Sequence, residues 1–157
     1  MLAVAASVAM PQASPTKSEI DDARDSNKAF ETIMVKFRKA EDWTPLVDQL
    51  EKTAKQYVGK SRIQVAMLDI EFPNAPAELK SKAALMAVKL DEAAAQAIRF
   101  TQAYRKALAV ARSVKPEDDA EHAVAYGNQA ESERLKFISA TKKWAAAVSD
   151  FAATAKK

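Results

Sequence analysis

Glycine is almost absent from this chain, since only Gly59 and Gly127 occur among its 157 residues. β-Sandwiches, barrels and α/β enzymes use glycine at many turns, where the backbone must adopt a positive φ. The sequence is instead rich in alanine, the residue with the highest helix propensity, and in Lys, Glu, Leu and Arg. This composition is typical of long helices, and we expect an all-α protein.

The spacing of apolar residues predicts where these helices lie, because apolar side chains recur at steps of three and four along most of the chain. Turns that contain proline separate the periodic segments. The predicted helices cover residues 18–41, 44–70 with a break near Gly59, 77–114 and 117–155. Short connections favour antiparallel neighbours, so we expect an up-down-up-down four-helix bundle over residues 18–157.

Capping residues support the predicted helix starts. Ser18-Glu19-Ile20-Asp21 has the form of a capping box, and Thr44 can cap the second helix with Pro45 at its first position. Acidic residues from Glu117 onward suit the start of the last helix. A buried strand over residues 62–72 is the local alternative, although the sequence offers it no partner strand.

Two tryptophans stand out within this pattern. Trp144 continues a heptad series of the last helix, and Val124 and Leu135 are expected to widen the same apolar face. Trp43 lies at the junction of the first two helices, where an aromatic ring can wedge them together. We interpret Trp43 and Trp144 as core or junction residues rather than ligand contacts.

The first residues suggest export. Met1 to Met10 form an apolar run followed by Pro-Gln-Ala-Ser-Pro, too short to cross a bilayer as a helix. This run is similar to the hydrophobic part and cleavage zone of an export signal, without the basic residues that precede such a signal. An alanine-rich disordered tail is the alternative. We therefore expect residues 1–17 to be a flexible, signal-like segment.

Residues for catalysis or metal binding are sparse. The chain has no cysteine and one histidine, His122, which lies beside Asp118, Asp119 and Glu121. A metal site there would need more converging ligands, so an exposed histidine in an acidic first turn is the better interpretation. Acidic neighbours such as Asp91 with Glu92, and Glu131 with Glu133, are interpreted as solvated charges. We predict no catalytic residues, no metal, no cofactor and no enzymatic activity.

Charge is weakly basic and dispersed, with 24 Lys and Arg against 21 Asp and Glu. Nucleic-acid binders concentrate Lys and Arg in a stripe or tail, which this sequence lacks, so we expect no nucleic-acid partner. The sequence also lacks a long apolar stretch of the kind that spans a membrane. The candidates for contact with a protein partner are Lys60, Arg62, Lys142 and Lys143.

Several of these segments resemble the PsbQ-type extrinsic proteins of photosystem II. The resemblance lies in a helix leading into Lys39-Ala40-Glu41-Asp42-Trp43, a break near Gly59 followed by Lys60 and Arg62, and the late segment Lys142-Lys143-Trp144-Ala145-Ala146-Ala147-Val148-Ser149-Asp150. The glycine-rich stretch and arginine-rich run of the family are reduced here, so the chain resembles a divergent member. The Asp-Trp at the first junction is the distinctive element.

The resemblance implies a cofactor-free subunit of the thylakoid lumen. Such a subunit would be peripheral to the membrane, contact the photosystem II core and other extrinsic subunits, and stabilise the oxygen-evolving centre by helping to retain calcium and chloride. From another class, a periplasmic or secreted helical bundle that binds a lipid or protein partner also fits the alanine-rich faces and scattered methionines. An enzyme would require catalytic groups that this sequence does not reveal.

Overall fold

The computed structural model describes residues 16–39, 43–115, 117–118 and 120–156. These residues form helices and, within those ranges, no strand, so the all-α prediction is confirmed. The helices are α1 (Lys17–Lys39), α2 (Thr44–Tyr57), α3 (Ser61–Glu71), α4 (Ala77–Ser113) and α5 (Glu121–Ala155). Of the signal-like segment predicted for residues 1–17, residues 1–15 lie outside the described residues, and α1 begins at Lys17. The predicted end of the first helix at Glu41 also lies outside the described residues.

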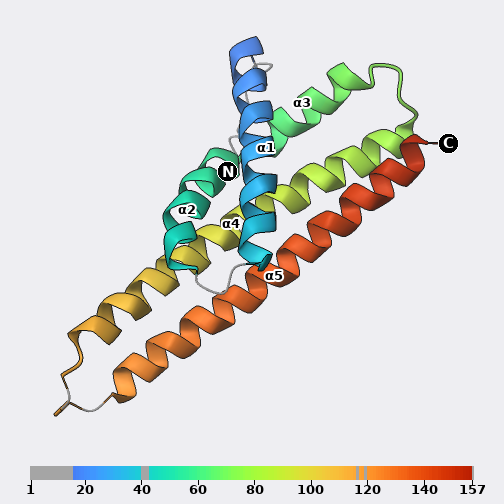
Figure 1. The fold of residues 1–157 in the computed structure, drawn as a ribbon. Coiled ribbons are helices and arrows are strands. Elements are labelled where there is room, and N and C mark those ends of the chain that lie inside the picture. Colours follow the sequence, from blue (N-terminus) through green and yellow to red (C-terminus); the bar gives the residue numbers. More distant parts are fainter. Residues whose placement is uncertain (1–15, 40–42, 116, 119, 157) are drawn as a thin grey trace, which may run out of the picture.

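The two longest helices form a hairpin, and the three shorter helices pack on it (Figure 1). α4 and α5 run antiparallel along most of their lengths, α2 and α3 pack on the α4 side of this hairpin, and α1 packs mainly on α2 and α3. The α4–α5 hairpin continues beyond the three shorter helices at the end where α4 leads into α5. Small buried residues line α4, among them Ala83, Ala87, Ala93, Ala94 and Ala97, and small side chains let two helices lie close together.

The main core lies where α2 crosses α4. Leu50 and Tyr57 from α2 are almost completely buried against the α4 face that carries Leu90 and Phe100. Phe100 stacks on Phe137 of α5 with ring centroids 6.0 Å apart. This aromatic contact joins the two helices of the hairpin at the level of the main core.

Polar side chains bridge the hairpin at two levels. The Lys82 ammonium donates hydrogen bonds to Asp150 at 3.1 Å and to Thr154 at 2.7 Å, and the bond to Asp150 raises the pKa of Lys82. Further along, the Gln96 amide donates to the Glu133 carboxylate, which lowers the pKa of Glu133. Lys82 near the start of α4 pairs with Asp150 near the end of α5, and Gln96 in the middle of α4 pairs with Glu133 in the first half of α5. The two bridges therefore fix the antiparallel register of the helices.

The first helix begins with a different capping box from the one predicted. Thr16 precedes the helix, its hydroxyl accepts from the Glu19 backbone N–H at 3.2 Å, and Glu19 accepts from the Thr16 N–H at 2.8 Å. The hydrogen bond from the Thr16 backbone holds the pKa of Glu19 below its usual range. The prediction of Ser18 as the cap was wrong because Thr16 also has an acidic residue three positions later.

At the first junction Thr44 does not cap α2. Trp43 precedes the helix, its carbonyl accepts from the N–H groups of Leu46 and Val47, and Thr44 is already helical. The Thr44 hydroxyl instead shares a hydrogen bond of 2.7 Å with the Tyr104 hydroxyl on α4. A tertiary partner therefore replaces the local bond that the sequence suggested.

The chain breaks between α2 and α3 at Gly59, which has a φ of +76°. Its N–H donates to the Asp91 carboxylate on α4, so Asp91 is not the solvated charge that we expected. Residues 61–71 continue as helix, and the alternative of a strand over residues 62–72 is wrong. The positive φ favours glycine, since other residues are strained in that conformation.

The last helix begins at Glu121 rather than at Glu117. Asp118 accepts from the Lys115 backbone N–H at 3.0 Å, and this turn occupies the acidic residues that we had placed in the helix. Val124 and Leu135 are 59% and 54% exposed, so the expectation that they widen the buried face was wrong.

Candidate functional site

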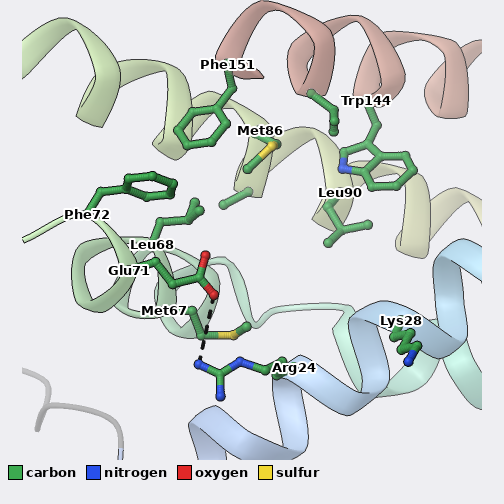
Figure 2. Close-up of a pocket in the computed structure, with 12 residues that line it drawn as sticks. Arg24, Lys28, Met67, Leu68, Glu71, Phe72, Met86, Leu90, Trp144 and Phe151 are labelled. Atoms are coloured by element: carbon green, nitrogen blue, oxygen red, sulfur yellow. Dashed lines mark ion pairs between the residues drawn. The ribbon is translucent and has the colours of Figure 1, made fainter. Parts of the chain in front are cut away.

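An apolar pocket of about 430 Å³ opens where α1, α3, α4 and α5 meet (Figure 2). Most of its lining is aliphatic, aromatic or thioether, from Met67, Leu68, Phe72, Met86, Ala87, Leu90, Trp144, Val148 and Phe151. Phe72 and Phe151 meet edge to face at one end, with ring centroids 5.6 Å apart. The volume falls within the range of small-molecule sites in proteins, which are mainly apolar with a few polar groups.

Three charged side chains complete the lining of this pocket, namely Arg24 and Lys28 on α1 and Glu71 on α3. Figure 2 shows Arg24 reaching across toward Glu71, and the two charges are 4.0 Å apart. Arg24 also pairs with Asp21 at 3.5 Å, while Lys28 has no ion-pair partner among the described residues. Cations therefore outnumber carboxylates around the pocket.

The two tryptophans occupy different environments. Trp43 packs against the main core, edge to face with Phe100 at 5.9 Å, and the Arg134 guanidinium lies 4.9 Å from its ring centre. Arg134 is held by Glu131, and this hydrogen-bonded pair raises the pKa of Arg134 and lowers that of Glu131. Glu131 is exposed, as expected of a solvated charge, and is also paired with Arg134. Trp144 packs beside the core and also lines the apolar pocket.

A second hollow, of about 360 Å³, lies between α4 and α5 and is lined by charged side chains. Three cations, Arg99, Lys136 and Lys143, line this hollow with one carboxylate, Glu92. Glu92 is paired with Lys89 at 2.9 Å, and Lys136 is paired with Glu133 at 3.3 Å. We call this hollow the basic groove. Its excess of positive charge complements an acidic surface.

The structure brings only one predicted partner-contact residue into the basic groove. Lys143 lines it, whereas Lys142, Lys60 and Arg62 are exposed and do not. Sequence reasoning missed Arg99 and Lys136. Lys136 and Lys143 are seven residues apart, and this helical spacing was a signal that could have placed them on one face.

The apolar pocket had no comparable signal in the sequence. Of its lining residues, Trp144 alone was singled out, and as a core residue. The helical periodicity assigns most of the lining side chains to buried faces but does not say how the helices cross. The volume of the pocket depends on how the helices cross.

His122 lies exposed in the first turn of α5. Within the described ranges, His, Asp and Glu side chains form no group of three that could hold a metal ion. The expectations of no metal and no cofactor stay predictions. None of the described helices combines the length and the apolar character needed to cross a membrane.

Known proteins add no further information on these two hollows. No protein-family model, curated protein sequence or solved structure matches this chain.

Proposed function

We propose that this chain is a non-enzymatic extrinsic structural subunit on the lumenal side of photosystem II, where it stabilises the oxygen-evolving centre. The observation that carries this proposal is the junction at Trp43, the distinctive element of the resemblance to PsbQ-type proteins. Its ring lies against Phe100 of α4 and Arg134 of α5, so this one side chain joins the start of α2 to both helices of the hairpin.

The helix order is compatible with this proposal. If α2 and α3 are counted as one helix interrupted at Gly59, the chain has the four segments of an up-down-up-down bundle. Such a bundle would act by occupying a surface of the larger complex, peripheral to the membrane and in contact with the photosystem II core and other extrinsic subunits.

The basic groove supports a partner with an acidic surface. Arg99, Lys136 and Lys143 present positive charge on a rigid pair of helices, and charges at the edge of an interface mainly speed association. Binding that depends on such charges weakens as salt rises.

The proposal is tested by washing photosynthetic membranes of the source organism with concentrated salt. We expect the wash to release the protein and to lower oxygen evolution in medium poor in calcium and chloride, and re-addition of the chain to restore it. Charge reversal at Lys136→Glu with Lys143→Glu should weaken rebinding several-fold, whereas Lys52→Glu, an exposed lysine on α2 outside the groove, should not. Recovery of the protein with the cytosol, or no release by salt, contradicts the proposal.

A second candidate function is that of a periplasmic or secreted helical bundle that binds a lipid or protein partner. The apolar pocket favours it, because such a protein needs an accessible apolar site. Localisation separates the two candidates, since only an extrinsic subunit should co-purify with photosystem II.

A further inference from the structure

We propose that the apolar pocket between α1, α3, α4 and α5 binds a single-chain amphiphile with an anionic head group, of the fatty-acid class. The hydrocarbon chain would lie among Met67, Met86 and Trp144, and the carboxylate would lie at Arg24 and Lys28. This inference goes beyond the photosystem assignment and holds for the isolated chain whether or not that assignment is correct.

The lining of the pocket selects a flexible apolar chain. Met67 comes from α3 and Met86 from α4, and unbranched thioether side chains adapt to ligands of irregular shape. Phe72, Trp144 and Phe151 add aromatic surface, which has a large apolar area. A cavity of about 430 Å³ with such walls removes much of a hydrocarbon chain from water, which is the main source of its affinity.

The charges select the head group. Glu71 is the one carboxylate in the lining, and it pairs with Arg24 at 4.0 Å, the outer limit of an ion pair. Lys28 lines the same pocket without an ion-pair partner among the described residues. Arg24 is shared between Glu71 and Asp21, so Lys28 is the cation of the lining that no described carboxylate pairs with. An arriving carboxylate is attracted by the charge of Lys28, whereas an arriving cation is repelled by it.

The direct test is calorimetric titration of the full chain with three amphiphiles that share a dodecyl chain and are kept below their micellar concentrations. We expect saturable one-to-one binding of dodecanoate, weaker binding of dodecanol and the weakest binding of dodecyltrimethylammonium. A dodecanoate brominated at the end of its chain should quench the fluorescence of Trp144, measured in a Trp43→Phe background. Equal affinity for the three head groups, tighter binding of the cation, or no saturable binding overturns the proposal.

Charge variants sharpen this test because their effects have opposite signs. Lys28→Gln should weaken dodecanoate binding roughly two- to five-fold, as expected for an exposed ion pair. Glu71→Gln should strengthen it by a similar factor, since the change removes the repelling carboxylate and leaves Arg24 with Asp21 as its one ion-pair partner among the described residues. Lys36→Gln, an exposed lysine further along α1 that does not line the pocket, is the matched control and should leave the affinity unchanged.

Filling the pocket tests the position of the hydrocarbon chain. Val148→Phe adds a ring inside the lining and should weaken dodecanoate binding by about ten-fold or more, while Val88→Phe, at a position 44% exposed on α4, should not. Equal effects of the two substitutions contradict the proposal. Melting curves establish that each variant folds, and if Val148→Phe fails to fold, the bromine quenching of the otherwise unaltered pocket decides. All of these measurements use the isolated chain, so the absence of amphiphile binding would not contradict the photosystem proposal. A negative salt-wash experiment would likewise not contradict amphiphile binding.

Discussion

The α4–α5 hairpin and the α1–α3 group bury side chains of different size. The buried residues of α4 and α5 include many small ones, among them Ala93, Ala97 and Thr141, beside the larger Leu90, Phe100 and Phe137. Polar bridges at Lys82 and Gln96 join the two helices at two levels. On α1–α3 the buried side chains are mostly large, namely Ile20, Ile33, Val47, Leu50, Tyr57, Ile63 and Met67.

This difference explains why the apolar pocket lies where it does. Small residues along two antiparallel helices allow a close, continuous contact, while large residues on short helices that cross α4 make local contacts with space between them. The pocket of about 430 Å³ opens where these short helices meet the hairpin. We therefore expect a larger side chain to destabilise the protein more within the hairpin than beside the pocket.

The largest expected effect comes from Phe100→Ala, because Phe100 is 1% exposed and belongs to both regions. Its ring contacts Trp43 and Phe137, and its loss leaves a cavity that should cost about 3–5 kcal/mol of unfolding free energy. Urea denaturation followed by circular dichroism measures this loss. An effect equal to that of Phe72→Ala, at a position 37% exposed, would show that Phe100 does not link the two regions.

Added volume gives the most direct contrast between the two regions. Ala93 is completely buried one turn before Gln96, on the side of α4 that faces α5, so Ala93→Leu should destabilise the protein by about 1–3 kcal/mol. Val148→Phe adds volume where the pocket already provides space and should change the unfolding free energy by less. Thermal denaturation of both variants measures the difference, and equal losses would contradict the packing contrast.

The substitution of glycine by alanine can be compared at the break between α2 and α3 and in α5 of the hairpin. Gly59→Ala forces alanine into a φ of +76° and should cost about 1–2 kcal/mol. Gly127→Ala lies in the second turn of α5, where an added methyl group meets no atom within 4 Å, and should stabilise the protein by about 0.5–1 kcal/mol. Urea midpoints test the opposite signs, and two changes of the same sign would be incompatible with this description of the break.

Glu133→Gln tests a polar bridge of the hairpin through pH. The folded-state pKa of Glu133 lies below its ordinary value of 4.5, mainly because Gln96 donates to the carboxylate. The charged form is therefore favoured by folding, and this contribution is complete above pH 4.5 and is lost as the pH falls through the lowered pKa.

We expect Glu133→Gln to cost about 1 kcal/mol near neutral pH, and the difference from wild type to shrink in acid. Urea denaturation across this pH range provides the measurement. The matched control, Glu92→Gln, removes an exposed pair with Lys89 and should change stability by less than about 0.5 kcal/mol at any pH. A difference that grows in acid would reverse the assigned sign.

The smallest expected effect is that of Thr16→Ala, which removes one half of the capping box of α1. The change should speed hydrogen exchange of amides in the first turn of α1 without altering exchange in α4 or α5. Ser18→Ala, at the position that sequence reasoning had chosen as the cap, is the control and should leave that exchange unchanged. Faster exchange in Ser18→Ala than in Thr16→Ala would restore the original assignment.

Sequence reasoning reached the all-α fold because helical periodicity is a local property of the chain. It was less successful where a side chain that could act locally bonds instead to a residue far away in the sequence. Thr44 has the side chain of a cap but bonds to Tyr104, and Asp91 has the surroundings of a solvated charge but bonds to Gly59. Tyr104 lies on another helix and Gly59 lies at the break between two others, and the sequence alone does not bring these partners together.

The candidate sites also depend on contacts between helices that the sequence alone does not show. Lys143 was identified because it is a lysine on a predicted helix, but its neighbours in the basic groove include Arg99 on α4, which only the hairpin register brings near. The apolar pocket depends on the crossing of four helices and has no counterpart in the periodicity of any single one.

The projecting end of the α4–α5 hairpin in Figure 1 can transmit force to the core. The α4–α5 hairpin extends past the shorter helices, and α4 continues from Tyr104, which is bonded to Thr44 of α2, to Ser113, a further reach of about 14 Å. Because each helix of this arm is continuous with the core of the molecule, a sideways force at the tip acts on the core as a torque. The arm is therefore a lever, and anything held at its end would stand at a fixed distance and angle from the body of the protein.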